Sequence, residues 1–419
     1  MSIDPTHLEH AVTADPVAVA DLLRISEPGD RLLRAGVLHS GAEALRGLLD
    51  GPRTDLHRTL REAAVACGLM ARDEDIGKSI DRWTLRVPDL DGVRDLRIMR
   101  TLDSRLIQAG DPEWPAGLRE LGLDEPVGLW VRGRGDLSAL CAGSIALVGS
   151  RAADSYGLHL ARSFGYDLVA AGHSVISGGA YGIDAAAHDG ALRAIDGPGA
   201  ATVAFMAGGV DRYYPRGNAE LLGAVARAGA VVSEAAPGST AMRHRFLMRN
   251  RLIAATAAAT VVVQAGWRSG ALNTANRAAE LLRPVGAVPG PVTAHDSAGC
   301  HRLIREGAAL LVTSAEEVRE LVEPLSAASA TDSTGAPAGS RSGQPQRSPE
   351  QARLQITDAL SEEQTRIYSA LPQRRGAEAA ALAARTGLDT AAAMAALAAL
   401  ELAGLAERRD HGWVKLRQG

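Results

Sequence analysis

Four arginines and one of only three phenylalanines lie within nine residues of this 419-residue chain, in the stretch RHRFLMRNR (243–251). A planar guanidinium group binds oxyanions through two parallel hydrogen bonds, and an aromatic ring offers a flat face for a nucleic-acid base. From position 235 to 279 the chain has six arginines and no Asp or Glu, although the whole protein carries a formal charge of -4. This local excess of positive charge predicts a surface that binds a polyanion.

The spacing in this stretch predicts a helix on which Arg243, Phe246 and Asn250 share one face and Arg245 and Arg249 share the next. Four apolar residues are then left to face a sheet: Leu247, Met248, Leu252 and Ile253. An exposed phenylalanine among arginines suits a single strand, whose bases stack while guanidinium groups hold the flanking phosphates. The alternative interpretation is that Phe246 is a core residue and that the arginines pair with distant carboxylates.

Three glycine-rich turns follow strand-like runs, where backbone N–H groups and a helix start could face an anion. Their residues of interest are Gly149, Ser150 and Arg151 in VGSR, Gly178, Gly179 and Gly182 in SGGAYG, and Arg268, Ser269 and Gly270 in WRSG. One such turn is more often a tight connection, but three at one sheet edge favour a phosphate-lined groove. None is the GxGxxG fingerprint, and GKS at 77–79 lacks the earlier P-loop glycine, so we expect no cofactor.

Other residues could take part in catalysis or metal binding, but the sequence favours a structural role for them. Asp184 and His188 are spaced to share a helix face, but no third metal ligand is evident, so a packing pair is favoured over a metal site. Asp211 follows a strand and could act as a base, although a turn-stabilising role fits better without a partner acid. The three cysteines are odd in number and lack CxxC spacing, which favours reduced thiols: Cys67, Cys141 and Cys300.

The order of apolar patterns predicts the domains. Helical spacing dominates residues 1–80, which suggests a small SAM-like helical domain, and residues 81–324 should form a Rossmann-like α/β core. In that core, seven apolar strand-like runs alternate with helices, as in a mainly parallel sheet covered on both faces: SIALVG, HSVISG, ATVAFMA, AVVSEA, ATVVVQA, PVGAVPG and ALLVT. Residues 325–355 should be a linker, because 14 of the 24 residues in 326–349 are Ser, Thr, Gly or Pro.

Residues 356–419 contain three helical patterns and a short hairpin turning at His411-Gly412, the arrangement of a winged helix. Its third helix, 389–403, contains no Arg or Lys, so it lacks the donors that reading a major groove requires. Protein contact is therefore the favoured role. Basic residues of the hairpin leave a DNA contact open there: Arg408, Arg409, Lys415 and Arg417.

The amino terminus, MSIDPTHLEH, shows neither a basic leader nor an apolar secretory core. The longest uncharged apolar run, 252–267, is too short to cross a bilayer. We therefore expect a cytoplasmic protein with no membrane span.

With these motifs assembled, the chain closely resembles the DNA-processing protein A family (DprA, or Smf). The resemblance runs in unbroken order from about residue 108 to 322, through WPAGLREL, VGSR, ISGGAYGIDAAAHDGAL, GGVDRYYPRGNAEL, FLMRNRLIA and SGALNTA. It implies a homodimer that binds single-stranded DNA and helps to load the RecA recombinase, without being an enzyme. By position it implies DNA contacts for Arg151, Arg243, Phe246, Arg249, Asn250 and Arg251.

The chain departs from the family pattern at Gln264, where the strand usually ends in VEA, and in ALNT, which usually reads SLIT. Both departures bear on the contacts expected of Ser269 and Gly270. Two other functions stay open at this point: a hydrolase of a nucleoside phosphate, and a winged-helix regulator that reads duplex DNA.

Overall fold

The amino-terminal helices form one continuous layer up to Arg100. The computed structural model describes residues 14–195, 201–322, 361–372, 376–402, 405–409 and 412–416. Six helices come first: α1 (Pro16–Ile25), α2 (Arg31–Ser40), α3 (Ala42–Leu48), α4 (Arg53–Ala66), α5 (Asp73–Thr84) and α6 (Gly92–Arg100). Trp83 in α5 is buried and its indole N–H donates to Asp30 (3.2 Å). The helical layer therefore continues past residue 80, the boundary predicted from the sequence.

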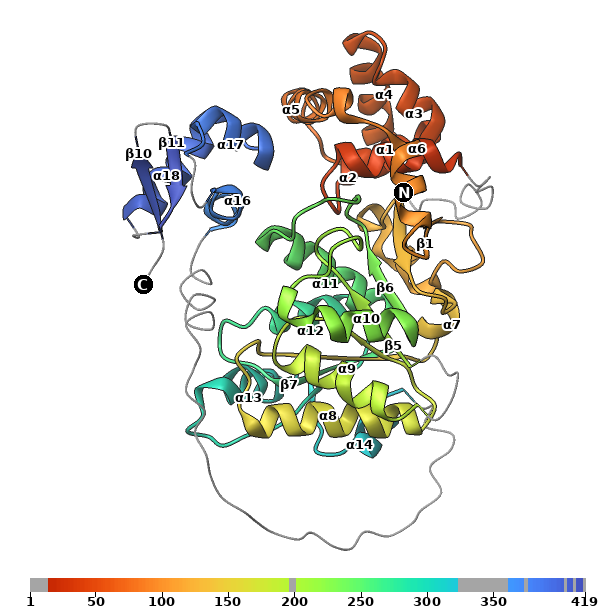
Figure 1. The fold of residues 1–419 in the computed structure, drawn as a ribbon, viewed down its shortest axis with the longest axis vertical. Helices are drawn as coiled ribbons and strands as arrows, with labels where there is room; N and C mark the ends of the chain where they lie inside the picture. Colours follow the sequence, from red (N-terminus) through yellow and green to blue (C-terminus); the bar gives the residue numbers. More distant parts are fainter. Residues whose placement is uncertain are drawn as a thin grey trace, which may run out of the picture.

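A sheet lies at the centre of the molecule (Figure 1). It has nine strands in the order β1-β2-β6-β5-β4-β3-β7-β8-β9. The strands are β1 (Ser104–Gln108), β2 (Gly128–Arg132), β3 (Ile145–Gly149), β4 (Val175–Ser177), β5 (Thr202–Phe205), β6 (Gly229–Ser233), β7 (Ala259–Gln264), β8 (Val285–Ala287) and β9 (Leu310–Leu311). The seven predicted strands, β3 to β9, are all present and mutually parallel. The antiparallel pair β1 and β2 extends the sheet at one edge and was not predicted.

Alternate residues of the parallel strands face opposite layers, as the pleat requires. The helices of the α/β core are α7 (Leu137–Cys141), α8 (Ser155–Ala170), α9 (Ile183–Arg193), α10 (Ala219–Arg227), α11 (Arg243–Thr256), α12 (Ala271–Glu280), α13 (Ala298–Arg305) and α14 (Ala315–Glu320). Ala146 and Val148 of β3 pack with α7, α11, α12 and α13. Ile145 and Leu147 pack with α8, α9 and α14. The mainly parallel, doubly covered sheet that the sequence predicts is confirmed.

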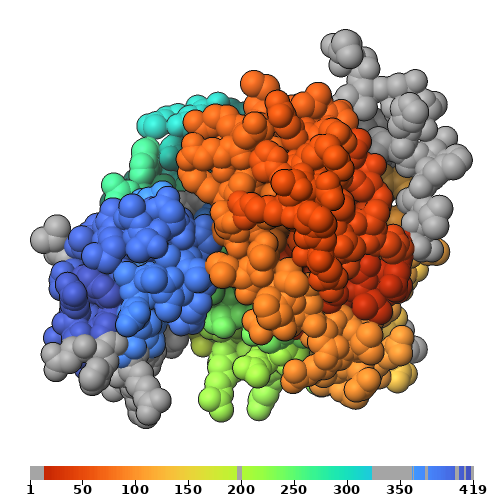
Figure 2. Space-filling view, turned by 90° about the horizontal axis from the view of Figure 1, so that it is seen from above, coloured from red at the N-terminus to blue at the C-terminus, as the bar shows by residue number. Residues whose placement is uncertain are grey.

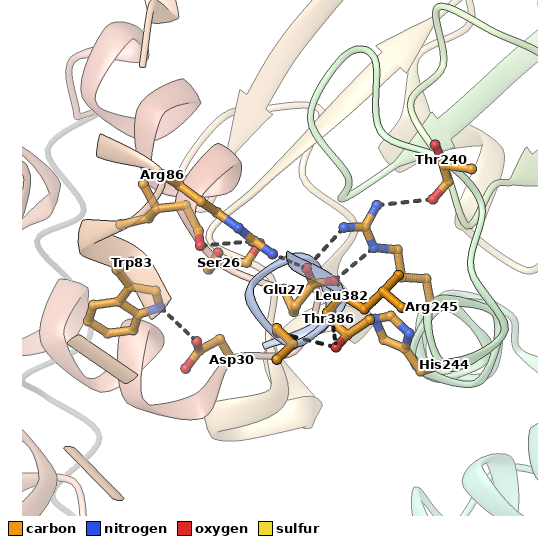
Figure 3. Close-up of polar contacts among 12 residues, drawn as sticks. Ser26, Glu27, Asp30, Trp83, Arg86, Thr240, His244, Arg245, Leu382 and Thr386 are labelled. Atoms are coloured by element: carbon orange, nitrogen blue, oxygen red, sulfur yellow. Dashed lines mark hydrogen bonds and ion pairs between the residues drawn. The ribbon is translucent and has the colours of Figure 1, made fainter. Parts of the chain in front are cut away.

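The amino-terminal helices share their apolar core with one half of the sheet. Side chains of α1 to α6 pack in one cluster with Trp130 of β2, Ala204 of β5 and Val231 of β6, and with α10. A polar junction lies beside this cluster. Figure 3 shows Glu27, between α1 and α2, reached by Arg86 from one side and by Arg245 of α11 from the other.

The carboxy-terminal residues form a separate small core of three helices and a hairpin. They are α16 (Glu362–Ala370), α17 (Ala379–Thr386), α18 (Thr390–Leu402), β10 (Ala406–Arg409) and β11 (Gly412–Lys415). The winged helix is confirmed, and its third helix carries no basic residue. Gly387, at the end of α17, lies against the side chain of Arg82 in α5, and Figure 2 shows the winged helix beside the amino-terminal helices. The predicted linker and the tip of the hairpin lie outside the described residues.

Candidate nucleic-acid interface

The first two glycine-rich turns meet at the carboxyl ends of the central strands. The chain order along the sheet reverses between β3 and β7, which is where ligands bind in open α/β sheets. After Gly149 ends β3, the N–H of Ser150 donates to the carbonyl oxygen of Gln264 at the end of β7 (2.7 Å). Gly182 has a φ of +76°, and a Cβ there would lie 2.2 Å from the Ser150 carbonyl oxygen. Only glycine allows this approach between the two turns.

Phe246 of α11 lies at the centre of a small aromatic and cationic cluster at this edge. The guanidinium carbon of Arg151 lies 4.5 Å from the centroid of the half-buried Phe246 ring, and that of Arg249 lies 5.9 Å from it. The Tyr214 ring, which is 48% exposed, lies 5.9 Å from the same ring. Sequence reasoning did not assign Tyr214 to the site, and the one signal that could have found it is its place in the GGVDRYYPRGNAEL motif. The cluster has the composition of a base-stacking platform.

Arg249 is a buried cation without an ion-pair partner among the described residues. Its Nη1 donates to the carbonyl oxygen of Phe205 (3.0 Å), and its Nε has no hydrogen-bond partner there. Burial lowers the pKa of Arg249 to about 10, opposed by the charge of Asp184. A Cβ at Gly178 would lie 1.6 Å from Nη1, so this glycine makes room for the guanidinium. A buried charge with so few partners is costly unless an anion joins it.

The remaining polar groups near the turns are used structurally. One carboxylate oxygen of Asp184 accepts the N–H groups of Gly178 (3.1 Å) and Ala180 (3.4 Å), and burial raises the pKa of Asp184. Burial lowers the pKa of His188 to about 3, and its Nδ1 is hydrogen-bonded to Thr202 Oγ1 (2.7 Å). No cluster of three potential metal ligands occurs within the described ranges. Asp184 is thus bonded to the second glycine-rich turn and His188 to Thr202, and no hydrogen bond joins Asp184 to His188 among the described residues.

Asp211 accepts a hydrogen bond from the N–H of Gly238 (2.9 Å), which joins two turns, as the turn-stabilising interpretation predicts. Asn218, which the sequence did not single out, holds the second glycine-rich turn. Its side-chain amide donates to the carbonyl oxygens of Gly179 and Ala180 (3.0 Å each). These bonds hold the turn whose Gly178 lies against the guanidinium of Arg249.

Two expectations for α11 are corrected. Arg251 is buried and pairs with Glu234 (2.7 Å), so its charge is already neutralised within the protein and the DNA contact expected of it is disfavoured. Arg245 pairs with Glu27 (2.8 Å), in line with the alternative of distant carboxylates for these two arginines. Leu247, expected to face the sheet, is 40% exposed. The helix packs against α12, β5 and α16, so it does not have one apolar face and one charged face.

The winged helix contacts the start of α11. The guanidinium of Arg243 donates to Thr365 Oγ1 and its backbone N–H donates to Ser369 Oγ, both at 3.3 Å, from α16. Arg243 is thus held by the carboxy-terminal domain in this structure. A phosphate contact by Arg243 stays a prediction.

The third glycine-rich turn is joined to α11 through Asn250. Its amide donates to the carbonyl oxygen of Gly270 (3.3 Å) and to Asn273 Oδ1 (3.4 Å). The Ser269 hydroxyl accepts the N–H of Ala271 at the start of α12 (3.3 Å). The structure therefore brings all three turns and α11 to one edge of the sheet, while the DNA contacts expected of Asn250, Ser269 and Gly270 stay predictions.

Comparison with known proteins agrees with this architecture. The family model for DNA recombination-mediator protein A matches residues 105–323, and the model for the DprA winged helix domain matches residues 343–412. The chain belongs to the DprA family. Its match to a DprA protein of Mycobacterium tuberculosis is 44% identical over 335 residues, covering 78% of this chain and 80% of that protein. The resemblance inferred from the motifs is confirmed.

Two further comparisons involve the DprA of Streptococcus pneumoniae. That sequence is 38% identical over 212 residues, covering 50% of this chain and 71% of that protein. Its crystal structure aligns with a TM-score of 0.59 at 27% identity, covering 74% of this chain and 98% of that one. DprA family membership therefore rests on both sequence and fold. None of the helices described for this DprA family member is both long enough and apolar enough to cross a bilayer.

Proposed function

We propose that this DprA family member is a recombination mediator that binds single-stranded DNA at the carboxyl edge of β3 and β7. The observation that carries the proposal is the cluster of Arg151, Phe246 and Arg249. Two guanidinium groups flank an accessible aromatic ring, and neither has an ion-pair partner among the residues described. Ion pairs would have neutralised these cations, as they neutralise Arg245 and Arg251.

An unpaired strand fits this cluster better than a duplex. A base can stack on Phe246 only if its face is free, and in a duplex the faces are covered by neighbouring base pairs. The guanidinium groups of Arg151 and Arg249 lie beside the ring and suit phosphate oxygens, and such contacts do not read base edges. We therefore expect tight binding with little sequence preference.

Replacing Arg151 with alanine should weaken binding to single strands of any sequence and should make its salt dependence shallower. Each lost phosphate contact on a single strand lowers the slope of log K against log salt by about 0.7. Fluorescence anisotropy of a labelled oligomer at several salt concentrations measures both quantities. Arg162→Ala is a matched control, because Arg162 lies on α8 and pairs with Asp189 (2.6 Å). If the slope of log K against log salt were equal for Arg151→Ala and the unmodified protein, Arg151 would not contact a phosphate.

We also propose that the protein acts by binding and not by catalysis. The carboxylates nearest the turns are engaged in holding backbone N–H groups, as Asp184 and Asp211 show. Incubation with mononucleotides, followed by chromatography, tests the rival hydrolase. Turnover that depends on Asp184 would favour that rival. A duplex-binding test of residues 354–419 alone addresses the third function, which the absence of Arg and Lys from α18 disfavours.

Loading of the RecA recombinase is the proposed outcome of DNA binding. Support comes from membership of the DprA family. The test is a strand-exchange assay in which a single-strand-binding protein already covers the DNA. This chain should relieve the block to RecA, and Arg249→Ala should relieve it less.

A homodimer is the proposed assembly, and the outer strand β9 supports it. Leu310 and Leu311 are 64% and 51% exposed on this edge strand, and an apolar edge can pair with its own copy about a two-fold axis. Leu310→Arg should therefore halve the mass measured by light scattering. Leu282→Arg is the control, since Leu282 is 93% exposed but lies outside the strand. A monomeric unmodified protein would contradict the proposal.

A further inference from the structure

Trp267 is an exposed tryptophan at the same sheet edge, three residues after the end of β7. Its side chain is 49% exposed, whereas the other four tryptophans of the chain are at most 6% exposed: Trp83, Trp114, Trp130 and Trp413. Indole has the largest flat face among the side chains, and its burial in the core is the usual outcome. The exposure of Trp267 therefore leaves a large stacking surface open to a ligand.

A second guanidinium stacks on this ring, as Arg151 does on Phe246. The guanidinium carbon of Arg302, from α13, lies 5.1 Å from the Trp267 ring centre. Its ion pair with Glu306 is long (3.8 Å), and its Nε has no hydrogen-bond partner in the described parts of the chain. Arg268 is exposed next to Trp267, and no ion pair of Arg268 occurs among the described residues. The combination is again an aromatic face with incompletely neutralised cations.

Trp267 and the Phe246 cluster lie on neighbouring segments along the same edge of the sheet. Gly149 at the end of β3 is paired with Gln264 at the end of β7, so the loops that carry Arg151 and Trp267 leave adjacent strands, which lie about 4.8 Å apart. Asn250, one turn after Phe246 in α11, donates to Gly270 in the Trp267 loop (3.3 Å). A strand that stacks on Phe246 and continues across β7 would therefore meet Trp267 next.

We infer that Trp267 is a second base-stacking platform for the same single strand. Arg268 and Arg302 would neutralise the phosphates on either side of the stacked base. This inference rests on the proposed function, because it extends the strand held at Phe246 by further nucleotides. It also assigns a role to the WRSG turn that does not depend on the SLIT sequence usual in the family.

Intrinsic tryptophan fluorescence tests the inference directly. Stacking on a base quenches indole emission, and Trp267 is the accessible indole among five, so addition of an unlabelled oligomer should quench the emission of the full-length protein. In Trp267→Phe the quenching should disappear, while binding measured by anisotropy is largely kept, because phenylalanine still offers a ring. Quenching that persists in Trp267→Phe would overturn the inference.

Oligomer length provides the second measurement. Trp267→Ala should weaken binding of an oligomer of about 16 nucleotides by roughly five-fold or more, and it should leave a tetramer almost unaffected, because the short strand fills only the Phe246 platform. Equal loss for both lengths, or none, would contradict the extension. Failure of the proposed function would look different: the unmodified protein would then show no anisotropy change with any oligomer. Circular dichroism checks that Trp267→Ala is folded.

Discussion

Arg249→Ala is expected to weaken binding of single-stranded DNA by about tenfold to a hundredfold, the largest effect of any substitution among the residues around Phe246. A hydrogen bond to a charged partner contributes about 1.5 to 3 kcal/mol, and the buried site of Arg249 reduces screening of that charge by water. Anisotropy titration measures the affinity, and thermal unfolding separates a binding defect from a folding defect. Arg249→Lys should be intermediate, since lysine keeps the charge but loses the planar fork.

Gly178→Ala tests the role of the Arg249 guanidinium without altering Arg249 itself. The added methyl group would lie 1.6 Å from Arg249 Nη1, so the arginine must leave its place. Because both changes displace one group, their effects on the free energy of binding should not add in the double variant. Gly47→Ala is the matched control, since a Cβ there meets no atom within 4 Å. Additive effects would show that Arg249 is not the group through which Gly178 acts.

Glu27→Ala is expected to lower the free energy of unfolding by about 1 to 3 kcal/mol, the cost of leaving the partners of a half-buried carboxylate unsatisfied. Glu27 joins Arg86 (2.8 Å), His244 (3.0 Å) and Arg245 (2.8 Å), so the substitution leaves the arginines without their carboxylate. Urea unfolding measures the change. Glu74→Ala is the control, because the Glu74–Lys78 pair is exposed and should contribute little. A similar response of the two variants would show that the junction does not hold the helical layer to α11.

The Glu27 junction also predicts a pH dependence of stability. Burial alone would raise the pKa of Glu27, but the hydrogen bond from His244 and the charge of Arg245 outweigh it and hold the pKa well below its usual range. A depressed pKa means that the stabilisation is fully present above the unfolded-state pKa of about 4.3 and is lost as pH falls through the folded-state value. The stability difference between the unmodified protein and Glu27→Gln should therefore shrink progressively below about pH 4.3. A constant difference down to pH 2 would contradict this assignment.

The local pattern was sufficient to predict the seven parallel strands. Each is a short apolar run bounded by turn residues, and burial on both faces leaves little else that such a run can form. The edge strand β1 was missed because SRLIQ mixes polar and charged with apolar residues, and only two of its five residues are buried. The strand β2 is buried from Gly128 to Val131, but so short an apolar run cannot be assigned to a strand by its period alone. The boundary at residue 80 was placed early because a local pattern does not show which helices share a core. Residue 80 lies inside α5, and Trp83 of α5 and Met99 of α6 pack in the same cluster as the earlier helices.

The arginine-rich helix separates what sequence and tertiary structure each determine. The fold class, the excess of positive charge in α11 and the meeting of the glycine turns at one edge could all be predicted from the sequence. Periodicity and turn chemistry act over a few residues, so the local pattern contains this information. Which arginines stay available for DNA depends on contacts between distant parts of the chain. Glu234 neutralises Arg251, and Glu27 neutralises Arg245 from a position 218 residues away, whereas Arg249 has no such partner among the described residues. An ion pair depends on distance in space, and the pattern along a chain does not contain that distance.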